Sequence, residues 1–223
     1  MRRILMVAAA ACGALVWPNL AAAEEAQIAS RNAALETTVN ADVDATWNRL
    51  ISHLGGRDYE INALVKHDRI IRVLFQSETP SLYVDCGEIS VHSRHSLFGD
   101  RNYNFPAASS VRYLVADEVA NELVDVERRT SLNALANIQL VPTGAGTLVR
   151  VDALYVMKIK TREFGNNVTT RKADEVVNFD STGRARATEE IRQGAESVPV
   201  TFECGATGAL ERKIVSALGS NGR

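Results

Sequence analysis

Apolar positions recur at two different periods along this chain, and each period predicts a different kind of element. From 43 to 54 the spacing is that of one helix face, with Asn40 or Asp42 as the N-cap and Gly55 as the stop. The same spacing returns from 207 to 218. Both segments are predicted to be amphipathic helices with one face in the core.

Between these helices the apolar positions alternate with polar ones, which predicts strands. The alternation is clearest in 132–140 and 149–157, which a Pro/Gly-rich turn connects. One apolar and one polar face is typical of an antiparallel sheet covered on one side. The further strands expected are 36–39, 59–65, 71–75, 82–86, 168–179 and 198–204.

The fold class predicted from this order is α+β, in a single domain over 36–219. An antiparallel sheet would carry the N-terminal and the C-terminal helix on one face, in a helix-grip-like arrangement. Residues 88–110 are rich in Ser and Asn and lack a clear period, so a long loop is expected there. Residues 117–127 fit either a short helix or a strand, and both readings stay open.

The first 23 residues have the order of a secretory signal peptide. Arg2 and Arg3 precede the uncharged run 4–17, and small residues end at Ala23, so cleavage is expected between Ala23 and Glu24. Residues 24–35 would then form a flexible leader. The predicted location is the periplasm, with no integral membrane span after the signal is removed.

Two other interpretations of this start are weaker. A transmembrane anchor needs about 18–20 apolar residues, and this run is shorter and ends at Pro18. A lipid-anchored outer-membrane protein would use Cys12, but the residues before it lack the usual leucine and those after it are apolar.

Charge argues against a nucleic-acid partner. The chain has a formal net charge of −2, and loss of Arg2 and Arg3 makes the mature protein more acidic. No cluster of Lys and Arg is dense enough to neutralise a phosphate backbone. Trp47 is the only tryptophan beyond the signal, and its helical spacing places it in the core.

Export leaves two cysteines, Cys86 and Cys204, and an oxidising compartment favours a disulfide between them. Each lies in register with the inward residues of its predicted strand. The competing interpretation is a reactive Cys86 thiol near His92 and His95, but catalytic pairs are defined by geometry rather than by sequence proximity.

The remaining polar residues show no recognisable catalytic, cofactor or metal site. His92 and His95 would point oppositely on a strand, which does not suit a shared metal. Asp85 and Glu211 are candidates for a carboxylate pair, but a strand surface and a helix N-terminal turn explain them equally well. We therefore expect a protein that is not an enzyme and holds neither a cofactor nor a metal.

Three segments resemble motifs of a known group of proteins. Tyr83–Gly87, Arg150–Tyr155 and Cys204–Glu211 are similar to motifs of proteobacterial exported proteins and lipoproteins without assigned activity. That resemblance spans roughly 36–219. It also implies domains similar to those of the small lipoprotein of the outer-membrane β-barrel assembly machine.

The leading functional hypothesis is a non-catalytic periplasmic domain with an envelope interaction or assembly role. Its partner would be an envelope protein, contacted through 88–110 or through an uncovered sheet edge. The alternative is a carrier that holds an apolar small molecule or lipid between the sheet and the terminal helix.

Overall fold

The computed structural model describes residues 35–219 apart from positions 57 and 167. The signal peptide predicted at 1–23 and residues 24–34 of the predicted flexible leader lie outside the described residues. Leu35, which was assigned to that leader, is the first residue of strand β1.

Strands dominate the order of elements. The N-terminal part comprises β1 (Leu35–Val39), α2 (Val43–Leu54), β2 (Tyr59–Val65), β3 (Ile70–Ser77), the 3-10 turn η1 (Pro80–Leu82) and β4 (Val84–Asp85). The middle comprises β5 (Glu88–Ser93), β6 (Arg101–Pro106), β7 (Val111–Asp117), β8 (Glu122–Thr143) and β9 (Gly146–Gly165). The C-terminal part comprises β10 (Val168–Asp180), β11 (Arg184–Gln193), β12 (Glu196–Ala206) and α3 (Ala209–Gly219).

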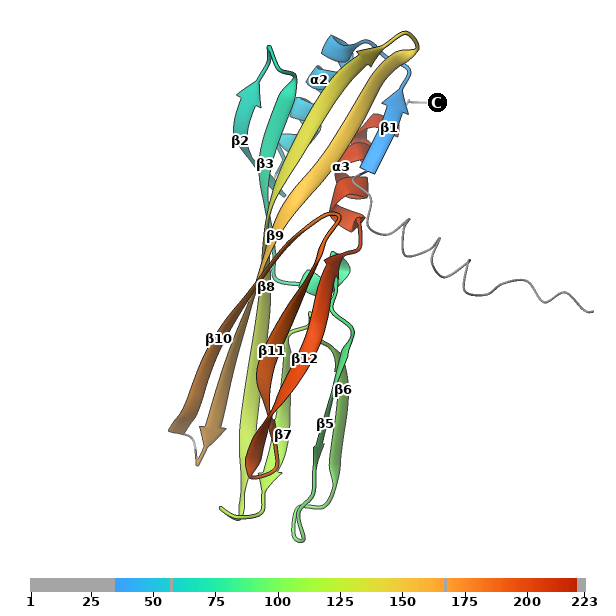
Figure 1. Cartoon of the computed structure of the whole chain (residues 1–223). Helices are drawn as coiled ribbons and strands as arrows, with labels where there is room; N and C mark the ends of the chain where they lie inside the picture. Colours follow the sequence, from blue (N-terminus) through green and yellow to red (C-terminus); the bar gives the residue numbers. More distant parts are fainter. Residues whose placement is uncertain (1–34, 57, 167, 220–223) are drawn as a thin grey trace, which may run out of the picture.

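The fold class predicted from the sequence is wrong. Strands hold 64% of the described residues and helices 14%, and the strands form three antiparallel sheets rather than a helix-grip α+β fold. The physical reason is the length of β8 and β9, which continue as one hairpin far beyond the two helices (Figure 1). The additional length is paired with other strands instead of being covered by helices.

The main sheet has seven strands in the order β1-β9-β8-β3-β2, with β10 also paired to β9 and β7 also paired to β8. Near one end of the β8–β9 hairpin its neighbours are β1 and β3, and near the other they are β10 and β7. The two smaller sheets are β11-β12-β4 and β5-β6. They lie beside the part of the β8–β9 hairpin that is away from the two helices (Figure 1).

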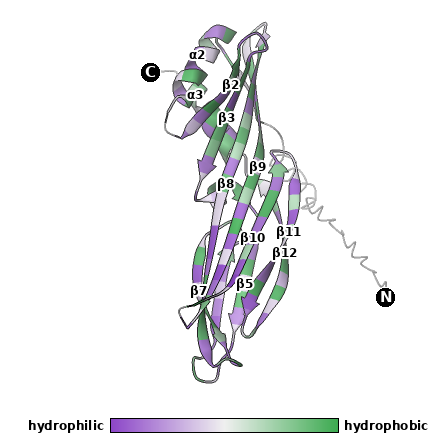
Figure 2. Ribbon diagram, turned by 90° about the vertical axis from the view of Figure 1, so that its left-hand side faces the viewer, coloured by the Kyte–Doolittle hydropathy of each residue, from purple (hydrophilic) through white to green (hydrophobic). Residues whose placement is uncertain are grey.

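The molecule therefore has two distinct ends. We call the end that carries α2 and α3 the helical end. We call the opposite end, where turns join β5 to β6, β7 to β8, β9 to β10 and β11 to β12, the hairpin end (Figure 1). Green and purple positions alternate along the strands in Figure 2, as expected when one face of each strand is buried.

Both helices form where the sequence predicted them. Asp42 caps α2 by accepting a 2.7 Å hydrogen bond from the amide of Ala45, which satisfies one free donor of the first turn. The helices contact each other and β9, and they bury Leu50 and Ile214 completely. No helix within the described ranges is both long and apolar enough to span a bilayer.

Two other expectations are corrected or resolved by the strand assignment. Residues 88–110 are not a long loop, since β5 and β6 pair as a hairpin with Glu88 opposite Pro106. Residues 117–127 are not a helix, because β7 ends at Asp117 and β8 begins at Glu122 after a short turn. Asn121 in that turn has a φ of 53°, a left-handed conformation that asparagine tolerates.

Candidate interaction surfaces

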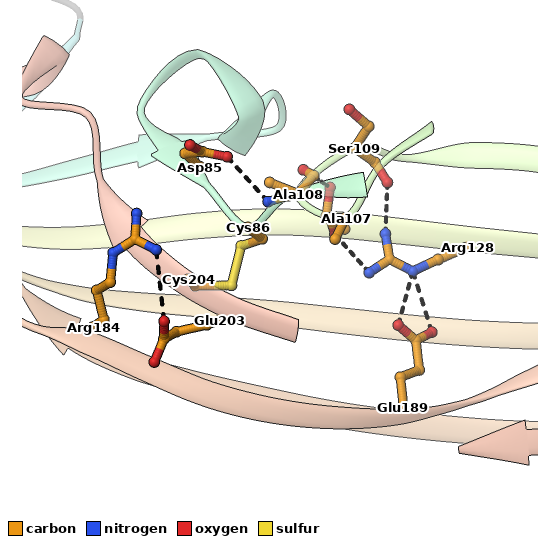
Figure 3. The surroundings of a disulfide bond; sticks show 12 residues. Asp85, Cys86, Ala107, Ala108, Ser109, Arg128, Arg184, Glu189, Glu203 and Cys204 are labelled. Carbon is orange, nitrogen blue, oxygen red and sulfur yellow. Dashed lines mark hydrogen bonds and ion pairs between the residues drawn. A yellow bond between two sulfur atoms is a disulfide. The ribbon is translucent and has the colours of Figure 1, made fainter. Parts of the chain in front are cut away.

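The disulfide predicted from the sequence is present. Cys86 and Cys204 are bonded, and their side chains are 3% and 0% exposed (Figure 3). Next to this bond β4 pairs with β12, with Asp85 opposite Gly205. Because the sulfur of Cys86 is consumed in this bond, the competing interpretation of a reactive thiol beside His92 is wrong.

The two histidines near Cys86 have separate environments on the β5–β6 hairpin. Nδ1 of His92 lies 2.5 Å from Oδ1 of Asn102 on the exposed face. His95 is 3% exposed, and its Nδ1 accepts hydrogen bonds from the amides of Leu97 and Phe98. Its role is to shape the β5–β6 turn.

Asp85 and Glu211 also have separate partners rather than forming a carboxylate pair. Asp85 is exposed and accepts a 3.0 Å hydrogen bond from the amide of Gly87. Glu211 is 1% exposed in the first turn of α3, and it accepts from the hydroxyls of Tyr155 (2.7 Å) and Ser181 (2.6 Å). The Glu211 interactions attach α3 to β9 and to the β10–β11 turn.

A buried ion pair connects the main sheet to the β11–β12 hairpin. Nε of Arg128 in β8 lies 3.0 Å from Oε2 of Glu189 in β11, and neither side chain is more than 2% exposed. Arg128 also donates to the carbonyls of Ala107 and Ser109, both at 2.7 Å (Figure 3). Thr161 in β9 donates to the same carboxylate at 2.8 Å. Four separate chain segments are thereby connected through one guanidinium and one carboxylate.

This network was missed at the sequence level, although a signal for it exists. Within β8 the inward positions are alternate residues, and Val126, Arg128 and Thr130 occupy them in succession. Extending the strand pattern seen at 132–140 backwards would have placed Arg128 in the interior. A buried arginine needs a partner, so the same pattern predicts an acidic residue on a facing strand.

The hairpin end presents large apolar side chains to solvent. Leu97 and Phe98 in the β5–β6 turn are 74% and 38% exposed, Val119 in the β7–β8 turn is 88% exposed, and Val168 at the start of β10 is 65% exposed. Single exposed apolar residues are common on protein surfaces, but four such residues in or next to three turns at the same end of the molecule are a different case. This arrangement is the candidate interaction surface of the molecule.

Charged groups behind these turns hold the hairpins together. Arg192 in β11 pairs with Asp117 of β7 and, at 3.4 Å, with Glu163 of β9. Glu163 also accepts from Arg171 of β10 at 3.0 Å, and it is only 1% exposed. Ser93 at the end of β5 accepts a 3.3 Å bond from the amide of Ala116. The four hairpins are thereby connected just behind their tips.

Local hydrogen bonds also fix the β7–β8 turn. Oδ1 of Asp117 accepts from the amides of Val119 (3.0 Å) and Ala120 (2.9 Å), while its other oxygen pairs with Arg192. The backbone that carries the exposed Val119 side chain is therefore fixed by the turn. A fixed backbone loses less conformational entropy on binding than a mobile one.

Comparison of the chain with family models, with curated proteins and with solved structures finds no match. The resemblance to proteobacterial exported proteins and lipoproteins therefore stays a prediction from the sequence.

Proposed function

We propose that this protein is an exported, non-catalytic domain of the periplasm that binds an envelope protein through its hairpin end. The observation that carries the proposal is the group of exposed apolar side chains at 97, 98, 119 and 168, on hairpins that ion pairs and the Ser93–Ala116 hydrogen bond connect. Residues 88–110, which the sequence put forward as the contact region, contribute two of these side chains.

A protein partner suits this surface better than a lipid bilayer. Exposed charged residues of both signs, Glu118 and Arg94, lie in these turns, and the exposed Glu196 lies at the β11–β12 turn. A mixed-sign polar rim around an apolar centre is the usual composition of a protein interface. An anionic membrane surface would instead favour a cluster of basic residues.

The proposed location rests on two features. The first is the signal-like order of residues 1–23, and the second is the Cys86–Cys204 bond, which is compatible with an oxidising compartment. Fractionation of cells that produce the full chain tests it. The protein should be released with periplasmic markers and should begin at Glu24; an uncleaved protein that stays in the cytoplasm would contradict the proposal.

The structure gives less support to a carrier of apolar small molecules. Beside α3, where the carrier hypothesis placed the ligand, Leu210, Ile214 and Leu218 are each less than 5% exposed and belong to one continuous core. The same core includes Leu50 and Leu54 of α2. The side chains of the protein itself occupy this region.

Site-specific photo-crosslinking in cells tests the proposed surface. A photoreactive residue would replace Leu97, Val119 or Val168 in turn, and Leu154 and Val176 serve as controls because they are exposed and apolar but lie on mid-strand positions. We expect one adduct of the same mass from all three turn positions and none from the controls. Mass spectrometry of the adduct then identifies the partner.

A triple variant tests whether these side chains are needed for the association. Leu97→Ser, Val119→Ser and Val168→Ser combined should abolish the association measured by co-purification while leaving the unfolding transition nearly unchanged, because exposed side chains contribute little to stability. Adducts that form equally at Leu154, or an association that survives the triple substitution, would refute the hairpin end as the binding surface.

A further inference from the structure

A groove of about 470 Å³ lies between the β4–β5 segment, the end of β6 and the C-terminal end of β12, where β4 pairs with β12. Val84, Cys86, Ala108 and Ala206 form its buried apolar floor, and Asp85 and Glu88 stand at its exposed rim. We call this groove the fork. Its lining includes Cys86 of the disulfide, and Figure 3 shows Asp85 and Ala108 of the lining near this bond.

The walls of the fork are fixed by bonds on both sides. The Cys86–Cys204 disulfide and the hydrogen bond from the Thr207 amide to the Tyr83 carbonyl (2.9 Å) hold one wall to β12. On the other wall the Ala107 amide donates to the Gly87 carbonyl at 2.8 Å, and Arg128 binds the carbonyl of Ala107. A groove held in this way is already in its binding shape, which lowers the entropic cost of binding.

Charge at the rim selects a cation. Asp85 and Glu88 are both exposed, and within the described part of the chain neither makes an ion pair. The basic residue of the lining, Arg184, lies 3.7 Å from Glu203 and is therefore balanced by a carboxylate. An apolar floor below a negative rim fits a side chain with an aliphatic stem and an ammonium head, which is a lysine.

The free edge of β12, which lies on the other side of Cys204 from the lining residue Ala206, favours an extended ligand. Strand β12 is paired with β11 along its length, but β4 covers its other edge only at Gly205 and Ala206. Among the described strands none pairs with this second edge from 200 to 203, up to Pro199, which has no amide hydrogen to donate. An uncovered stretch of this kind can accept a partner strand through main-chain hydrogen bonds.

We propose that the fork binds a lysine side chain carried on an extended segment of a partner protein, with the segment added to the free edge of β12. The main chain of the segment would supply affinity, and the ammonium group between Asp85 and Glu88 would supply specificity. This site is separate from the hairpin end, so it stands or falls independently of the function proposed above.

Titration with defined peptides tests the proposal on the oxidised protein that begins at Glu24. The probe is the peptide acetyl-Thr-Val-Lys-Val-Thr-amide, and the matched probe has norleucine, which has no ammonium group, in place of lysine. Binding would be followed by calorimetry and by amide chemical shifts. We expect the lysine peptide to bind at least fivefold more tightly, with the largest shifts at Gly87, Glu203 and Ala206.

Two variants assign the preference to the rim. In the double variant Asp85→Asn and Glu88→Gln, lysine-peptide affinity should fall at least fivefold while norleucine-peptide affinity stays the same. The control Glu175→Gln removes an exposed carboxylate on β10 and should change neither affinity. Equal binding of the two peptides, shifts that map elsewhere, no binding at millimolar peptide, or an unchanged preference in the double variant would each overturn the proposal.

Discussion

Arg128 and Glu189 form an ion pair that is shut off from solvent, with Nε and Oε2 3.0 Å apart and side chains 0% and 2% exposed. Their strands, β8 and β11, belong to different sheets, so the pair connects the main sheet to the sheet β11-β12-β4. Charges in such a place are costly to desolvate, and they are stable only while each keeps its partner.

Removing one member of this pair should therefore destabilise the fold strongly. We expect Glu189→Ala to lower the free energy of unfolding by about 3–5 kcal/mol, because it leaves the Arg128 guanidinium buried and uncompensated. Arg128→Met should cost a similar amount, since it also frees the carbonyls of Ala107 and Ser109. Urea unfolding of the oxidised protein measures both.

The double variant and a surface pair provide the comparison. Arg128→Met combined with Glu189→Leu should cost less than the sum of the single substitutions, because no lone charge is left behind. Arg150→Ala breaks the exposed pair with Glu36 and should cost about 0–1 kcal/mol. Additive costs in the buried cycle would show that the two residues do not act as a unit.

Periodicity predicted the local elements well and the architecture poorly. The helix at 43–54 and the β8–β9 hairpin follow from the spacing of their own apolar residues. The long extensions of those strands were hidden, because Arg128 and Glu163 occupy inward positions that the pattern expects to be apolar. Pairing between β3 and β8, or between β12 and β4, is decided by contacts distant in sequence, which no local period records.

Some residues of the candidate surfaces could be predicted from the sequence and others could not. The Cys86–Cys204 bond was predicted because cysteine chemistry and compartment are readable in a single sequence. The apolar turn residues were not, since Leu97, Phe98 and Val119 lie in polar stretches and indicate no strand face. Only the topology brings these turns to one end of the molecule.

The disulfide closes a long loop, and its loss should be measurable as stability. Cys86 and Cys204 are 118 positions apart, and the chain-entropy model gives roughly 5 kcal/mol for a loop of that length. We expect the Cys86→Ala, Cys204→Ala double variant to lose about 2–5 kcal/mol in urea unfolding. A thiol assay on native wild-type protein should find neither cysteine free, and a transition insensitive to reductant would contradict this expectation.

Alkaline pH should weaken the fold through Tyr59. Burial raises the pKa of its phenol from 10.0 to about 12, partly opposed by the nearby Lys213 ammonium, and the hydroxyl oxygen is buried without a hydrogen-bond partner among the described residues. The unfolded state therefore loses this proton first as pH rises, so stability is retained below pH 10 and declines from pH 10 to about 12. Burial also raises the pKa values of Tyr113 and Tyr155.

Tyr59→Phe separates this contribution from those of the other tyrosines. The variant should be close to wild type in stability at neutral pH, because it removes a buried hydroxyl to which no residue in the described part of the chain is hydrogen-bonded. Between pH 10 and 12 it should lose less stability than wild type. Unfolding curves at a series of pH values, with phenolate absorbance as a second signal, provide the measurement; equal losses in the two proteins would contradict the assignment to Tyr59.

Arg192 should control the rigidity of the hairpin end. Its side chain is 18% exposed and pairs with Asp117 and Glu163, and its Nε donates to the Gly194 carbonyl at 2.7 Å. We expect Arg192→Gln to cost about 1–3 kcal/mol, because it weakens the satisfaction of buried carboxylates. Amide hydrogen exchange should accelerate most at Val119 and Ala120, whose turn depends on Asp117.

Arg192→Gln should weaken the partner contact most at the turn that loses all of its ion pairs. Glu163 still binds Arg171 after the substitution, so the β9–β10 turn keeps one of its connections, whereas Asp117 loses its only ion pair among the described residues. Crosslinking in cells should therefore fall more at position 119 than at 168. Arg112→Gln, which breaks the exposed pair with Asp125 on the same two strands, is the matched control and should leave both yields unchanged. If exchange at the β7–β8 turn and the crosslinking yields are the same in Arg192→Gln as in wild type, the ion pairs do not position the tips for binding.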